Sequence, residues 1–209
     1  MRFKHKVGAT RQTRGKKLLN GLLLVISIAG LVGGIYLLVL VLTPNIAVLY
    51  PVKKIEAKAL PKPAGDRVYI PKIGVDVSIN TGGAEALNDG AWHRYPERGD
   101  PIKGGNFILS AHRFAIGLTP GETKKRSPFY HVDKLKKGDQ ILVDFQGKRY
   151  GYEIISHNEV KPNQIEIEAP SDEAKLTLYT CTFKGESDGR EVYVAKPLGE
   201  VDSNGNVQQ

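Results

Sequence analysis

The sequence contains a single cysteine, Cys181, among its 209 residues. An internal disulfide needs two cysteines, so no disulfide framework holds this chain together. Zinc sites need Cys or His ligands in closely spaced pairs, and one cysteine with scattered histidines does not provide them. The roles left for the thiol are an inert buried side chain, an intermolecular bond or a nucleophile.

Charged side chains are absent between Lys17 and Lys53. Within this gap Gly21–Leu42, "GLLLVISIAGLVGGIYLLVLVL", is a run of 22 almost entirely apolar residues. About 20 such residues cross a bilayer as a helix. A cleavable signal peptide is the alternative, but its apolar region is about 7–15 residues long and ends at small residues. We therefore expect residues 18–42 to be an uncleaved transmembrane signal anchor.

Acidic residues are absent from the first 17 residues, which carry seven Lys or Arg. Because basic flanks stay in the cytoplasm, residues 1–17 are expected to be a cytoplasmic basic arm near anionic lipid headgroups. The rest of the chain would then be extracytoplasmic, on a single-pass protein of the cell membrane. The net charge is +8, so the chain without these seven cations is near +1 (8 − 7). This balance gives no reason to expect a nucleic-acid partner.

The remainder shows no internal repeat. Residues 43–65 contain four prolines and predict a linker, while residues 199–209 form a polar tail. Residues 66–198, roughly 130 positions, are enough for one domain with its own core.

Short segments rich in β-branched residues and bounded by Gly, Pro and Asn predict strands in this domain. They cover residues 67–73, 75–80, 106–113, 140–147, 148–160, 164–168, 174–183 and 191–198. The turn-like "QGKR" predicts a hairpin between the fourth and fifth segments. Helical spacing of Phe129, Val132 and Leu135 predicts one helical turn in residues 127–135. About eight strands with little helix predict an all-β fold, either an antiparallel barrel or a sandwich.

Cys181 lies near the end of its strand, before the polar, glycine-containing "KGESDGR". Strand ends beside loops hold reactive groups accessibly on a rigid support. A cysteine nucleophile is most often assisted by histidine. His112 ends an apolar strand and is favoured; His93 lies in a loop that could line a cleft, while His131 and His157 read as surface positions.

Arg190 follows Cys181 by nine residues and immediately precedes a strand. If residues 182–189 connect two neighbouring strands, Arg190 returns to the same end as Cys181. Its guanidinium could then supply donors to a developing oxyanion or orient a substrate carbonyl. A surface ion pair with Glu186, Asp188 or Glu191 is the alternative role.

These residues resemble the sortase family. "TLYTC" is similar to the sortase signature TLxTC, with Arg190 in the position of the family's arginine, and "NFILSAHR" resembles the family's strand ending in Gly-His-Arg. "SPFYHVDKLKKGDQI" and "GAWHRYPERGDPIKGGN" resemble further sortase segments, the latter from class E or D enzymes. Together the motifs cover most of residues 66–198.

The resemblance implies an eight-stranded sortase-type β-barrel with short helices and a cysteine transpeptidase activity. Such enzymes cleave LPxTG-like sorting signals of surface proteins through a thioester, which an amine of a cell-wall precursor or a pilin lysine resolves. Carried over, Cys181 is the nucleophile, His112 the general acid/base and Arg190 the oxyanion or substrate-orienting residue. Thr180, Ala111 and His93 are candidate substrate-binding residues.

Some features depart from the family's pattern. Ala111 replaces the usual glycine before the histidine, and the sequence shows neither an Asp-Pro-aromatic lid nor a C-terminal membrane helix, unlike pilin-polymerising class C enzymes. The acidic "IEIEAPSDE" lies near the position where some class A sortases bind calcium. Acidic residues in loops are usually only solvated, so we expect no cofactor, and calcium is the less favoured alternative. Three alternatives stay open: a hydrolase on the same fold, a pilin-type sortase, and a non-enzymatic surface binding module with an inert Cys181.

Overall fold

The computed structural model describes residues 14–46, 63–202 and 207–208. The chain divides into two compact units, Met1–Val39 and Leu40–Gln209. Most of the expected basic arm and linker lies outside the described residues.

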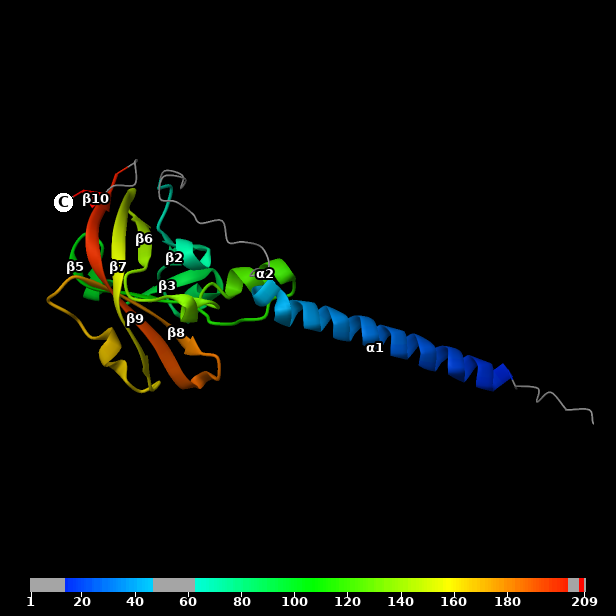
Figure 1. The fold of residues 1–209 in the computed structure, drawn as a ribbon. Helices are drawn as coiled ribbons and strands as arrows, with labels where there is room; N and C mark the ends of the chain where they lie inside the picture. Colours follow the sequence, from blue (N-terminus) through cyan, green and yellow to red (C-terminus); the bar gives the residue numbers. More distant parts are fainter. Residues whose placement is uncertain (1–13, 47–62, 203–206, 209) are drawn as a thin grey trace, which may run out of the picture. The chain divides into compact units, whose positions relative to one another are not determined.

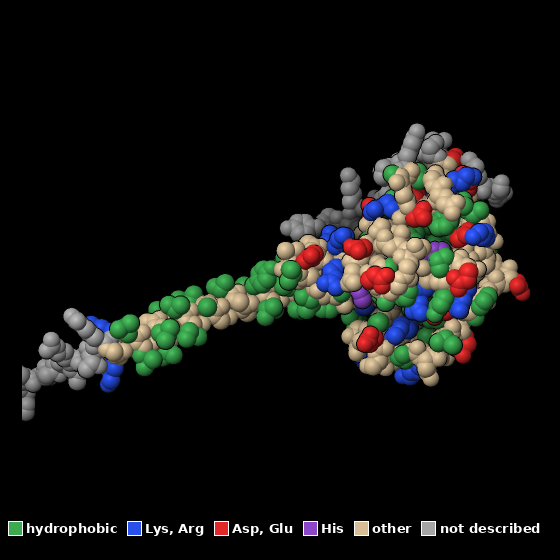
Figure 2. Space-filling view, turned by 180° about the vertical axis from the view of Figure 1, so that it is seen from behind, with side chains coloured by type: hydrophobic (Ala, Val, Ile, Leu, Met, Phe, Trp, Pro, Cys, Tyr) green, Lys and Arg blue, Asp and Glu red, His purple; other side chains and the backbone are tan. Residues whose placement is uncertain are grey.

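One long helix, α1 (Arg14–Ile46), contains the apolar run. Its Gly15–Asn45 portion, 31 residues, is long and apolar enough to cross a membrane. Large apolar side chains from Leu18 to Leu42 are exposed along it, and hydrophobic side chains cover it in Figure 2. A helix that is apolar on all sides suits a lipid environment, because its backbone groups are bonded internally.

Eight strands close into a β-barrel (Figure 1). They are β1 (Arg67–Ile70), β2 (Val75–Asn80), β3 (Gly90–Arg94), β5 (Gly104–Ser110), β6 (Gln140–Phe145), β7 (Lys148–Val160), β8 (Lys175–Thr182) and β9 (Gly185–Val201). The order around the barrel is β9-β7-β6-β1-β2-β3-β5-β8, and β8 pairs back onto β9. The short β4 (Gly99–Asp100) and β10 (Val207–Gln208) pair with β5 and β9. The expected all-β, eight-stranded barrel is confirmed.

Two of the strand pairs are parallel, β2 with β3 and β5 with β8. The other pairs are antiparallel, including the long β7–β9 pair. Because β5 and β8 run in the same direction, their carboxyl ends reach the same edge of the barrel.

The core fills the barrel with alternating side chains from these strands. Phe107 and Leu109 of β5 and Leu176 and Leu178 of β8 are almost fully buried in it. Tyr193 of β9 joins them, and its hydroxyl donates to the Val132 carbonyl oxygen at 2.7 Å. This packing makes the β5–β8–β9 region a rigid support for the residues at its edge.

Short helices occupy the connections. They are the 3₁₀ segments η2 (Pro71–Ile73), η3 (Ala84–Asn88), η4 (Pro96–Arg98), η5 (Val132–Lys134) and η6 (Ile165–Glu168), and the α-helix α2 (Pro120–Arg126). In α2 the Thr119 side chain caps the first turn by accepting from the Glu122 amide. The anticipated helical turn in residues 127–135 corresponds to η5.

Three expectations about elements need correction. The predicted strand at 164–168 is instead the 3₁₀ segment η6. The Asn106 side-chain amide donates to the Ile167 and Ala169 carbonyl oxygens at 3.1 and 2.8 Å and holds this segment in place. Strand β3 lies in a segment that was expected to be a loop. Strand β9 continues to Val201, into the expected polar tail.

Candidate active site

The barrel brings Cys181 and His112 to one edge. Ser110 on β5 lies opposite Tyr179 on the parallel strand β8, and His112 and Cys181 each follow that pair by two residues. Since side chains alternate along extended chain, both emerge beside one another on the same face. His112 and Cys181 line the same hollow.

The main chain around His112 is fixed to the cysteine strand. The Thr180 hydroxyl donates to the Ala111 carbonyl oxygen at 2.7 Å, and the Ala111 amide donates to the Tyr179 oxygen at 3.4 Å. On the other side, the Phe129 amide donates to the His112 carbonyl oxygen at 3.2 Å. These bonds hold the histidine backbone in register with Cys181.

Thr180 and Ala111 were expected to contact substrate, but the structure does not bring them into the hollow. Both are buried, with 1% and 3% of their surface exposed. Alternation along β8 turns Thr180 inward where Cys181 turns outward. Their contacts position His112.

His112 is half-buried, and its surroundings favour the neutral imidazole. Burial lowers the pKa of His112 because the charged form loses hydration, and the nearby Arg126 cation lowers it further. A neutral imidazole can accept the thiol proton, and the resulting imidazolium can donate it to a leaving group.

Arg190 lies directly across from Cys181 in the antiparallel β8–β9 pair. Its Nη1 donates to the Glu186 and Gly189 carbonyl oxygens at 2.6 and 3.0 Å. A Cβ on Gly189, the residue before Arg190, would lie only 3.0 Å from the Val160 main-chain oxygen. A larger residue at position 189 would therefore press against the end of β7. With Nη1 held in place, the fixed guanidinium has further donors for a substrate carbonyl.

Arg113, next to His112, is a residue of the candidate site that the sequence alone did not indicate. Its side chain is 2% exposed, and its Nη1 and Nη2 lie 2.8 Å from Glu191 Oε1 and 3.0 Å from Asp133 Oδ1. Its Cζ also lies 3.9 Å from the centre of the Phe183 ring. Arg113 thus connects the histidine loop to β9 and to the segment after Cys181. The sequence offered one signal for this residue: Arg113 directly follows the histidine that ends an apolar strand.

Aromatic side chains form the rim of the hollow. Phe114, Tyr130 and Phe183 line it together with Glu186. The Tyr130 ring centroid lies 5.9 Å from that of Phe114 and 5.1 Å from that of Phe183, in edge-on geometry. The Phe183 residue is 57% exposed, so this rim faces solvent beside the thiol.

The structure does not bring His93 to the hollow. It is 2% exposed, lies edge-on to Phe107 with ring centroids 4.7 Å apart, and has its Nε2 3.0 Å from the Gly99 carbonyl oxygen. The parallel pairing of β3 with β2 and its antiparallel pairing with β5 turn this side chain into the barrel. His93 was expected to line a cleft, but it lies in the core.

The other two histidines are also accounted for by local contacts. His157 stacks on Tyr193 with ring centroids 4.2 Å apart, and His131 lies edge-on to Tyr130. Neither lines the hollow that contains Cys181.

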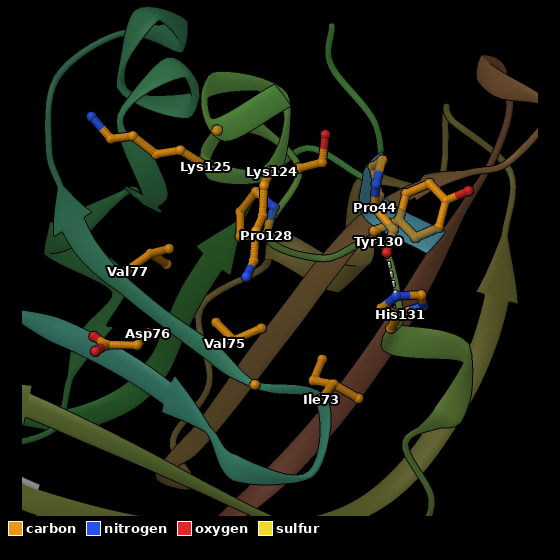
Figure 3. A pocket seen from close by; sticks show the side chains of 13 residues that line it. Pro44, Ile73, Val75, Asp76, Val77, Lys124, Lys125, Pro128, Tyr130 and His131 are labelled. Atoms are coloured by element: carbon orange, nitrogen blue, oxygen red, sulfur yellow. Dashed lines mark hydrogen bonds between the residues drawn. The ribbon is translucent and has the colours of Figure 1, made fainter. Parts of the chain in front are cut away.

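A second hollow, of about 290 Å³, shares Tyr130 with the first (Figure 3). Ile73, Val75 and Val77 line it, with Lys124 and Lys125 beside them. Its lining includes neither Cys181 nor His112, so it does not share the chemistry of the first hollow. Within the described part of the chain, no group of three or more His, Cys, Asp or Glu side chains is arranged to hold a metal ion.

Comparisons with known proteins agree with this geometry. A family model, the Sortase domain, matches residues 68–198. Sortase SrtE1 of Streptomyces coelicolor is 31% identical over 149 residues, covering 64% of this chain and 40% of the relative. Sortase A of Bacillus anthracis is 25% identical over 134 residues, covering 64% of this chain and 59% of the relative. The chain thus spans less than two thirds of either curated relative.

A solved structure of a Sortase D5 transpeptidase from Clostridium perfringens superimposes with a TM-score of 0.54 at 26% identity. The match covers 67% of this chain and 82% of that one.

Proposed function

Because the chain belongs to the sortase family, we propose that it is a membrane-anchored, extracytoplasmic cysteine transpeptidase. It would cleave LPxTG-like C-terminal sorting signals and join the released acyl group to an amine of a cell-wall precursor. The observation that carries this proposal is that Cys181 and His112 line one hollow, with Arg190 directly across from Cys181 in the β8–β9 pair.

In the first half of the reaction, the Cys181 thiol loses its proton to His112 and Sγ attacks the scissile carbonyl carbon. Arg190 stabilises the negative charge that develops on the carbonyl oxygen. The C–N bond then breaks, His112 protonates the leaving amine, and the acyl group remains on Sγ as a thioester.

In the second half, the acceptor amine attacks the thioester carbonyl. A C–N bond forms, the C–S bond breaks, and the amine's proton passes through His112 to the departing thiolate. The Cys181 thiol and His112 return to their starting state, so this route needs no metal or redox cofactor.

The helix α1 would anchor the enzyme, with the N-terminus in the cytoplasm and the barrel outside. This topology rests on the apolar length of α1 and the basic residues before it. Surface proteins bearing sorting signals would then meet the enzyme after export.

Product analysis tests the proposal. The full chain in detergent is incubated with an LPxTG-containing peptide, with and without a primary amine, and products are separated by mass. We expect an amide product that requires both the amine and Cys181. Cleavage that gives only the free acid at every amine concentration would establish a hydrolase, and full cleavage by Cys181→Ala would contradict the assignment of the nucleophile.

A further inference from the structure

The aromatic rim and Glu186 form a surface whose chemistry suits a cation. Phe114, Tyr130, Phe183 and Glu186 all line the hollow that contains the thiol. Aromatic faces attract cations electrostatically, and a carboxylate adds a full opposite charge. An amine at neutral pH is protonated and carries that charge.

The position of Glu186 follows from the turn after Cys181. Thr182 pairs with Gly185, but Cys181 pairs with Arg190, so residues 186–189 bulge out of the β8–β9 ladder. The Glu186 carbonyl oxygen accepts from Arg190 Nη1 at 2.6 Å. The main chain of Glu186 is therefore tied to the arginine beside the nucleophile.

The other charges in this turn are engaged. Asp188 accepts from the Thr182 hydroxyl at 2.7 Å and lies 3.9 Å from Lys184 Nζ. Among the described residues, no ion pair engages the Glu186 carboxylate. It can meet a ligand's charge without first breaking an internal contact.

The cations nearest the rim do not exclude a further positive charge from the hollow. Arg113, under the Phe183 ring, is balanced by Glu191 and Asp133. Arg190 donates from Nη1 to two main-chain oxygens and is not among the residues that line the hollow. Glu186 is the acid that lines the hollow itself.

We propose that Glu186 and the rim of Phe114, Tyr130 and Phe183 form the acceptor subsite, which binds the primary ammonium group of the second substrate. This assignment rests on the proposed transpeptidase function. The ammonium docks beside the thioester and releases its extra proton to solvent through His112. The free amine then attacks the acyl carbon, the C–S bond breaks, and a second amine proton passes through His112 to the departing Cys181 thiolate.

The test separates the two halves of the reaction. The full-length enzyme in detergent receives an LPxTG-containing peptide, and the rate of thioester formation is measured first by rapid quenching and intact-mass analysis. The thioester is then partitioned between water and one of two nucleophiles. Triglycine amide is protonated at neutral pH, whereas hydroxylamine is uncharged.

Glu186→Gln should lower the second-order rate constant for triglycine amide by about threefold to fivefold, the size expected for one partly exposed charge pair. Glu186→Lys should lower it further, and added salt should reduce the difference from wild type. Thioester formation and the reaction with hydroxylamine should change by less than about twofold. Glu173→Gln, the same change at an exposed acid outside the hollow, serves as the matched control.

An equal loss with both nucleophiles, or no loss with triglycine amide, would overturn the acceptor assignment. A wild-type thioester that does not react with triglycine amide would overturn it too. Failure to form any thioester would instead contradict the proposed function, so the two ideas fail in different ways.

Discussion

His112 and Cys181 lie 69 positions apart in the sequence (181 − 112), and parallel pairing of β5 with β8 places them side by side. Burial and Arg126 both lower the pKa of His112, so its neutral form dominates more strongly at neutral pH than for an exposed histidine.

The rate of peptide cleavage should therefore follow a bell-shaped pH profile. The two limbs of the kcat/KM profile report an essential base and an essential acid of the free enzyme. His112→Gln should lower kcat/KM by about 10²- to 10⁴-fold, the usual contribution of a general acid or base, and should change the shape of the profile. An unchanged bell in His112→Gln would assign proton transfer to another residue.

His93 should make folding stability sensitive to acid. Burial lowers the pKa of His93 below its usual value of 6.5, so the folded state binds its proton less readily than the unfolded state. The stabilisation is present above that value and is lost as the pH falls toward the folded-state pKa. His112 and His131, whose pKa values are also lowered, contribute in the same direction.

Thermal unfolding midpoints measured from pH 7.5 down to 5 should fall less steeply for His93→Gln than for wild type. His157→Gln, the same substitution at an exposed histidine, serves as the matched control. Parallel pH dependences for wild type and His93→Gln would show that the buried histidine does not drive the loss.

At the level of elements, the candidate active site depends on the contacts that join the β5 end to β8 and β9. Thr180 holds Ala111 from β8, and Arg113 reaches Glu191 on β9 and Asp133 in η5. A buried charge that loses its partner is costly, which makes this ion pair a sensitive point.

Arg113→Met should destabilise the domain by about 3–5 kcal/mol, since it leaves the Glu191 carboxylate without its buried partner. The double variant Arg113→Met/Glu191→Gln should recover part of that loss, because the uncompensated charge is removed. Denaturant unfolding of the four proteins of this cycle measures the coupling. Additive effects of the two changes would mean that the pair has no energetic role.

The strands of the core were predictable because their alternation is local, as in β1, β2, β6, β7 and β8. The hairpin between β6 and β7 was also predictable, and its turn residues Gln146 and Gly147 have positive φ values of 48° and 80°. The Cys181, His112 and Arg190 assignments came from the motif resemblance, and the pairing register supplies the geometry that brings them together.

What the sequence did not reveal depends on distant partners. Strand β3 is short, and its pairing with β2 and β5 turns His93 inward. The alternating "QIEIE" predicts a strand, but the segment is a 3₁₀ helix. Its Glu168 carboxylate forms an ion pair with Arg94 at 3.1 Å and accepts a hydrogen bond from the Tyr179 hydroxyl. Arg113 and the aromatic rim likewise gain their roles only from residues far along the chain.

At the scale of the whole molecule, the lone cysteine offers a direct test of topology. A membrane-impermeant methanethiosulfonate reagent added to intact cells should label Cys181, because the barrel is expected outside the membrane and the thiol is partly exposed. Cys181→Ala should remove the label. Labelling that appears only after the cells are permeabilised would place the barrel in the cytoplasm.

The central claim is that Cys181 carries the acyl group between two substrates. The full chain should be mixed with an LPxTG-containing peptide in the absence of an amine, quenched in acid, and analysed by intact and peptide mass. We predict a mass increase equal to the acyl portion of the peptide, located on Cys181, sensitive to hydroxylamine and absent from Cys181→Ala. Cleavage of the peptide by wild type with no acyl adduct at any quench time, and equally by Cys181→Ala, would contradict the account.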